Sequence, residues 1–176
     1  MQTRIHKRIG WTTLLLVLIA GVFWHQALAA DSSPQVTLNV SKATPRALEP
    51  LTQNVILRDY KFAWASLSIA LQSNSLSSLN GLFVGEAGAY LAAEVKGQQA
   101  NGLASRYSNQ NHKVEAVFYS PEGDILELHD TAEYDFEILD GGKSIHTEHT
   151  VVYYIVLMTP GSDRWVIRHL QAVPQF

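Results

Sequence analysis

The sequence predicts an α+β fold in which N-terminal helices pack on a curved antiparallel sheet. Three observations predict it. Residues 50–99 carry apolar side chains at spacings of three and four, which is typical of helices. From residue 114 onward, apolar and polar side chains alternate, as in strands with one solvated face. Turn sequences rich in Gly, Pro and Asp separate these strands, so we expect them to pair as hairpins.

Length and composition indicate one globular domain. The chain has 176 residues, of which 47% are apolar and 16% are charged, a balance that favours a packed core over disorder. The sequence has no cysteine, which excludes disulfides, thiolate nucleophiles and Cys-based zinc sites.

The first thirty residues predict export. Three basic residues precede an apolar run over residues 11–24, and small residues follow it. Residues 1–30 are therefore expected to be a signal peptide or a signal anchor, and cleavage after Ala29 would release a secreted or periplasmic domain. Without cleavage, residues 11–30 would anchor the chain as a single membrane span, with the C-terminal domain outside. Either way, we expect an extracytoplasmic domain.

Beyond this segment we expect a linker and three helical pieces. Residues 31–49 are rich in Ser, Pro, Thr and Ala, which is typical of a linker. Residues 35–40 alternate, however, and an edge strand is the alternative there. Apolar spacing predicts helices over residues 50–72, 77–83 and 85–99.

The strands are expected in the C-terminal half. Alternation and turns place them at residues 114–119, 126–138, 144–159 and 165–173. In the second of these strands one parity is apolar and should face the helices; it comprises Leu126, Leu128, Ala132, Tyr134, Phe136 and Ile138.

This order of elements resembles the nuclear transport factor 2-like superfamily, also called SnoaL-like. The resemblance is carried by the Tyr60–Leu71 helix, the Leu79-x-x-Leu82-Phe83 segment, residues 131–136 and the ending from Tyr153 to Ile167. The chain is also similar to a domain of a chloroplast-division protein that faces the intermembrane space. The resemblance implies a cone-like fold over residues 50–176. It does not imply one function, because the superfamily contains enzymes, ligand carriers and interaction modules.

The candidates for catalysis are Asp130, His149 and Tyr153. Asp130 has the parity of Leu128 and Ala132, and a carboxylate on an apolar face is costly to ionise. If His149 and Tyr153 also point inward, the three side chains would suit proton transfer or binding of a polar ligand. The alternatives are an exposed Asp130 at a strand bulge and a half-buried histidine with no chemical role.

The sequence predicts no metal and no cofactor. In the segment His146-x-Glu148-His149, the first two side chains share a strand face and His149 takes the other, so three ligands do not converge. His129 on the neighbouring strand could join His146 and Glu148 on the outer face, but a hairpin surface of mixed charge is the commoner explanation of this pattern. No phosphate-binding loop or nucleophile elbow is present in the sequence.

The strand over residues 144–159 predicts an interaction surface because it is apolar on both parities. One parity should meet the helices, and the other needs a cover or a partner. We assign the uncovered parity to Val152, Tyr154, Val156 and Met158. A homodimer or an envelope protein would bind there through the sheet.

The leading hypothesis is therefore a non-enzymatic extracytoplasmic domain for protein interaction or small-ligand binding at the bacterial envelope. The alternatives are a small proton-transfer enzyme of the isomerase or dehydratase type, and a structural subunit of a secretion or division assembly. After removal of residues 1–29, ten basic and sixteen acidic residues remain, a formal charge of −6. This acidity argues against nucleic-acid binding.

Overall fold

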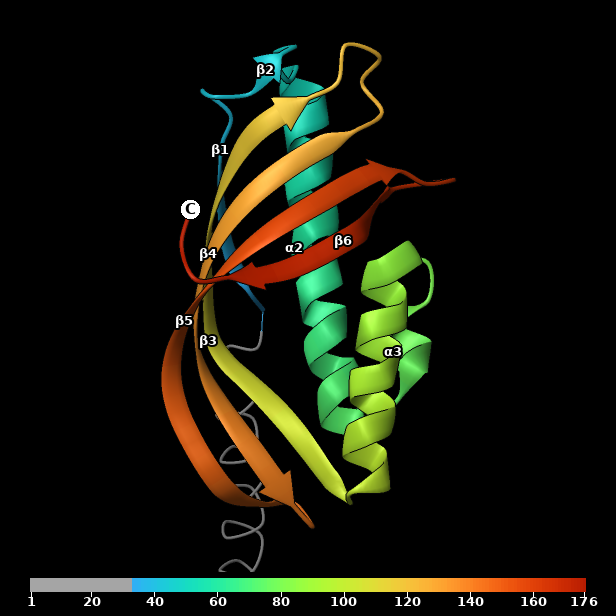
Figure 1. Ribbon diagram of the computed structural model, residues 1–176, viewed down its shortest axis with the longest axis vertical. Helices are drawn as coiled ribbons and strands as arrows, with labels where there is room; N and C mark the ends of the chain where they lie inside the picture. The colour runs from blue at the N-terminus through green and yellow to red at the C-terminus, as the bar shows by residue number, and fades with distance from the viewer. Residues whose placement is uncertain (1–32) are drawn as a thin grey trace, which may run out of the picture. The chain divides into compact units, whose positions relative to one another are not determined.

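The computed structural model describes residues 33–176, which form an α+β domain (Figure 1). The predicted signal peptide or anchor, residues 1–30, lies outside the described residues. Within residues 33–176, no helix is long and apolar enough to span a membrane.

Two α-helices and a short 3-10 helix fill the N-terminal half. Helix α2 spans Pro50–Ser73, η1 spans Leu76–Leu79 and α3 spans Gly85–Ala100. Proline suits the first turn of α2 because it has no N–H to leave unpaired. Asn74 ends α2 in the left-handed conformation, with φ of 51°, and its N–H bonds to the carbonyl of Ala70. These helices match the predicted ranges, except that the middle piece is a single 3-10 turn.

Four long strands follow and pair in sequence order. They are β3 (Leu103–Tyr119), β4 (Leu126–Asp140), β5 (Lys143–Pro160) and β6 (Trp165–Val173), and each neighbouring pair is antiparallel, as predicted. Strand β3 begins earlier than its predicted start at residue 114, because its first half is polar and lacks the alternation on which the prediction depended.

The segment expected to be a linker contributes two strands to the sheet. Strands β1 (Gln35–Asn39) and β2 (Thr44–Pro45) both pair with β3 in parallel, so the sheet is mixed, with the order β1-β3-β4-β5-β6. Val36 is buried against the core, which explains why the alternating residues form a strand. The edge-strand alternative is therefore correct for this segment, and the prediction of a plain linker is wrong there.

The core lies between the helices and one face of the sheet. In Figure 1, α2 and α3 lie on the same side of the curved strands. The core side chains of α2 recur at helical spacing and include Ile56, Tyr60, Trp64, Leu67 and Leu71. They meet the alternating residues of the sheet, among them Val114, Ala116, Leu126, Leu128 and Ile167.

The prediction of an uncovered interaction surface on β5 is wrong, because the residues assigned to it face the helices. Val156 and Met158 are fully buried, and the Tyr154 ring packs 5.3 Å from the Trp64 ring. Val152 shares their parity. Antiparallel pairing explains the inversion: Leu128 lies opposite Val156, and cross-strand partners share a face. Because β5 is apolar on both parities, its own sequence could not determine which side meets the helices.

Candidate functional site

Asp130 points into the core and is part of a buried polar network. Its side chain is 0% exposed. The Tyr60 hydroxyl donates to Asp130 Oδ2 over 2.7 Å, and His112 Nδ1 lies 2.7 Å from the same oxygen. The prediction of an inward Asp130 from strand parity is therefore correct, and the alternative of an exposed bulge is wrong.

Burial controls the chemistry of this network. It raises the pKa of the Tyr60 phenol well above its ordinary value, and the adjacent Asp130 raises that pKa further. Tyr60 thus remains protonated and acts as a hydrogen-bond donor. The network joins α2 to β3 and β4, because its three members come from these three elements.

Several buried polar atoms around the network have no partner within residues 33–176. They are Asp130 Oδ1, His112 Nε2, Trp64 Nε1 and Gln110 Oε1. The Trp64 ring packs 4.4 Å from the His112 ring and covers that side of the network. An acid or base needs contact with its substrate, and the burial of Tyr60, His112 and Asp130 prevents such contact in this conformation.

His149 and Tyr153 do not join Asp130, because they lie on the opposite face of the sheet. His149 is exposed and lies between Asp135 (2.8 Å) and Glu133 (3.2 Å). The bond with Asp135 raises the pKa of His149 and lowers that of Asp135. Tyr153 packs edge-on against the ring of Phe176, near the C-terminus.

The histidines near the β4–β5 hairpin also lie apart. His146 contacts Glu148 over 3.3 Å, His149 lies on the other strand face, and His129 contacts Glu127 over 3.3 Å. In the described part of the chain, no three His, Asp or Glu side chains gather as a metal site.

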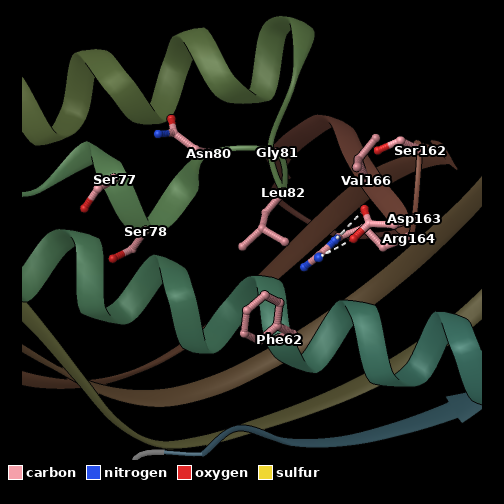
Figure 2. A pocket seen from close by; sticks show the side chains of 10 residues that line it. All are labelled: Phe62, Ser77, Ser78, Asn80, Gly81, Leu82, Ser162, Asp163, Arg164 and Val166. Carbon is pink, nitrogen blue, oxygen red and sulfur yellow. Dashed lines mark hydrogen bonds and ion pairs between the residues drawn. The ribbon is translucent and has the colours of Figure 1, made fainter.

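A pocket of about 390 Å³ opens on the surface where three distant segments meet (Figure 2). Phe62 on α2 forms one wall, and the β5–β6 turn with the start of β6 forms another. The remaining wall is η1 and the turn after it. The lining residues are Phe62, Ser77, Ser78, Asn80, Gly81, Leu82, Ser162, Asp163, Arg164 and Val166. Leu82 and Val166 are buried and supply an apolar floor.

The charged lining of the pocket is one internal ion pair. Arg164 Nη2 and Nε donate to the two carboxylate oxygens of Asp163 over 2.6 and 3.1 Å. The guanidinium carbon also lies 5.5 Å from the centre of the Phe62 ring. The ion pair lowers the pKa of Asp163 and raises that of Arg164, so both groups stay charged near neutral pH.

Three tertiary hydrogen bonds bring these pocket segments together. The Asp59 carboxylate on α2 accepts from the backbone N–H of Trp165 over 2.8 Å. Ile167 N donates to Leu82 O and Val84 N donates to Ile167 O, each over 2.9 Å. These contacts attach β6 to both α2 and the turn after η1.

Sequence reasoning missed His112, Asp59 and the pocket. His112 has the parity of Val114 and Ala116, which are buried, so extending that alternation backwards would have placed it inside. Asp59 lies on the apolar side of α2 next to Tyr60, a position that signals a buried carboxylate. No local pattern marks the pocket, because its walls come from three separate segments, at residue 62, residues 77–82 and residues 162–166.

Comparison with known proteins supports the fold. No family model matches the chain, and no curated protein matches it either. Among solved structures, the chain is similar to the intermembrane space region of the chloroplast protein ARC6, with a TM-score of 0.56 and 15% sequence identity. The likeness covers 73% of this chain and 98% of that one. At this identity the likeness shows the fold and nothing further.

Proposed function

We propose that residues 33–176 form a non-enzymatic module that acts outside the cytoplasm and binds another protein through the pocket at Phe62 and Arg164. The observation that carries this proposal is that solvent reaches the pocket but does not reach the buried polar network at Asp130. The inward carboxylate, Asp130, is fully buried, whereas the pocket is open to solvent and combines an apolar floor with polar walls. Binding sites combine apolar surface with a few placed polar groups, and this pocket has both, although polar residues make up most of its lining.

The placement outside the cytoplasm has two supports. The basic and apolar pattern of residues 1–30 is typical of a signal peptide or signal anchor. The solved structure that resembles this domain is an intermembrane space region. We also propose that this domain belongs to the nuclear transport factor 2-like superfamily, a proposal that depends on the order and packing of its elements.

A proton-transfer enzyme is the second candidate. One observation favours it: Asp130 lies 2.7 Å from His112, a pairing that can relay protons. It would require α2 to move away from the sheet so that substrate reaches the carboxylate. The Tyr60–Asp130 bond opposes that movement. We therefore rank this candidate below the binding module.

Site-specific photo-crosslinking in the native cell tests the binding module. A photo-reactive residue replaces Asn80, on the rim of the pocket, or Gln99, an exposed residue of α3 that does not line it. We expect one discrete protein adduct from position 80 that is absent from position 99 and is reduced by Phe62→Ala. Identical adducts from both positions, or none from either, would contradict the proposal.

A further inference from the structure

We propose that the pocket binds an uncharged, extended polypeptide segment that places one apolar side chain against Phe62, Leu82 and Val166. This inference rests on the proposed function, since it names the chemistry of the partner at the same site. It depends on three properties of the pocket: its charge balance, its hydrogen-bonding groups and its apolar floor.

The charge balance excludes a strongly charged ligand group. Arg164 and Asp163 neutralise each other through two hydrogen bonds, and the other lining residues carry no charge. An entering carboxylate would meet Asp163, and an entering ammonium group would meet Arg164. Neither would find an unpaired counter-charge to compensate for its lost hydration. An uncharged segment avoids this penalty.

The polar walls offer both donors and acceptors. The side chains of Ser78 and Asn80 make no hydrogen bond within the described residues, and both can donate and accept. Arg164 uses Nε and Nη2 for Asp163, which leaves Nη1 as a further donor. A peptide group presents one N–H and one C=O, so an extended backbone matches these walls.

The apolar floor gives the segment an anchor. In Figure 2 the Phe62 ring, the Leu82 side chain and the Arg164 guanidinium lie around the same part of the pocket. Phe62 is 51% exposed, so an apolar side chain of a partner can cover ring surface that now faces water. The guanidinium is already positioned against the ring, so binding does not have to order it.

A peptide selection tests this chemistry. Peptides displayed from a random library are selected on the full chain in detergent. Their binding is then compared between Phe62→Ala and a matched control, Ile69→Ala. Both side chains are exposed on α2, at 51% and 56%, but only Phe62 lines the pocket. We expect uncharged peptides with one apolar residue, about tenfold weaker binding to Phe62→Ala and unchanged binding to the control.

Charge substitutions then test the role of the ion pair. A selected peptide is made in three forms, with Asn, Asp or Lys at the position next to its apolar residue. We expect the native chain to prefer the Asn form, Asp163→Asn to shift preference towards the Asp form, and Arg164→Gln to shift it towards the Lys form. Each shift should be about fivefold to tenfold.

Two results would overturn the inference in different ways. Preference of the native chain for the Asp or Lys form would refute the uncharged partner but leave the pocket as a binding site. Binding that ignores Phe62→Ala would refute the pocket as the peptide site. The crosslinking experiment, which does not depend on peptide chemistry, would then decide separately whether the domain is a binding module.

Discussion

The substitution Tyr60→Phe tests whether the buried network stabilises the fold. It removes one hydroxyl and keeps the aromatic ring in the core. The lost hydrogen bond is 2.7 Å long and ends on a carboxylate, and both side chains are almost fully buried. Hydrogen bonds to charged groups contribute about 1.5–3 kcal/mol, and water cannot replace the hydroxyl at this depth. We expect the free energy of unfolding to fall by about 2 kcal/mol.

Asp130→Ala should have a larger effect than Tyr60→Phe. It leaves the Tyr60 hydroxyl and His112 Nδ1 buried without a partner, and each such group costs about 1–3 kcal/mol. We expect a total loss of about 4 kcal/mol. In the Asp130→Ala background the Tyr60 hydroxyl has no acceptor, so adding Tyr60→Phe should cost little or restore some stability. The two substitutions should therefore be strongly non-additive.

Urea unfolding of residues 33–176, followed by circular dichroism, measures these changes. Tyr90→Phe is the matched control, because Tyr90 is 60% exposed on α3 and its substitution should change stability by less than about 0.5 kcal/mol. If Tyr60→Phe unfolds at the same urea concentration as Tyr90→Phe, the hydroxyl does not donate to a buried carboxylate. Additive effects of Tyr60→Phe and Asp130→Ala would equally refute the network.

Three further predictions concern the sheet and its surface. Val156→Asp should destabilise the domain by about 4 kcal/mol, whereas Val151→Asp, on the exposed face, should change its stability by less than about 0.5 kcal/mol; equal urea midpoints would show that the faces of β5 are wrongly assigned. Deleting residues 33–45 should remove about 3 kcal/mol by exposing apolar surface on β1 and β3, and an unchanged midpoint would argue against the parallel strands. In an NMR titration, His149 should gain its proton above its ordinary pKa of 6.5, so that its stabilising contribution is present below that pH and is lost as pH rises through the raised pKa. Asp135→Asn should move the midpoint of His149 downward, and a midpoint that stays in place would assign the shift to another group.

Local sequence patterns predicted much of the fold. The apolar spacing of α2 located that helix within one residue at its end, and the alternation of β4 placed Asp130 correctly on the inner face. Both patterns succeed because one face of each element is apolar and the other polar, so the pattern itself identifies the buried side. The parallel strand β1 was less evident because it is only five residues long and lies in a segment whose composition is typical of a linker.

The orientation of β5 could not be predicted from its own residues. Val151 and Val156 have the same side chain, yet one is 47% exposed and the other is fully buried. What separates them is the pairing of β5 with β4, where Leu128 lies opposite Val156. That pairing joins residues far apart in the sequence, so the sequence of β5 alone does not reveal it. Because the faces of β5 are the reverse of those predicted, His149 and Tyr153 lie on the side of the sheet opposite to Asp130. The three predicted catalytic residues therefore do not lie together, because the inner and outer faces of β5 were assigned in reverse.

The position of the pocket depends on tertiary contacts in the same way. Its lining comes from α2, from the turn after η1 and from the β5–β6 turn, and none of these segments has a recognisable binding motif. The Asp59–Trp165 bond holds β6 to α2, and the bridge between Phe83 and Ile167 holds it to the turn. Because both contacts use β6 backbone groups, they position Arg164 without depending on its side chain. The exposed lining side chains can therefore vary in charge and size while the walls stay in place, which is the property that the proposed binding module would need for its partner specificity to reside in a few exposed residues.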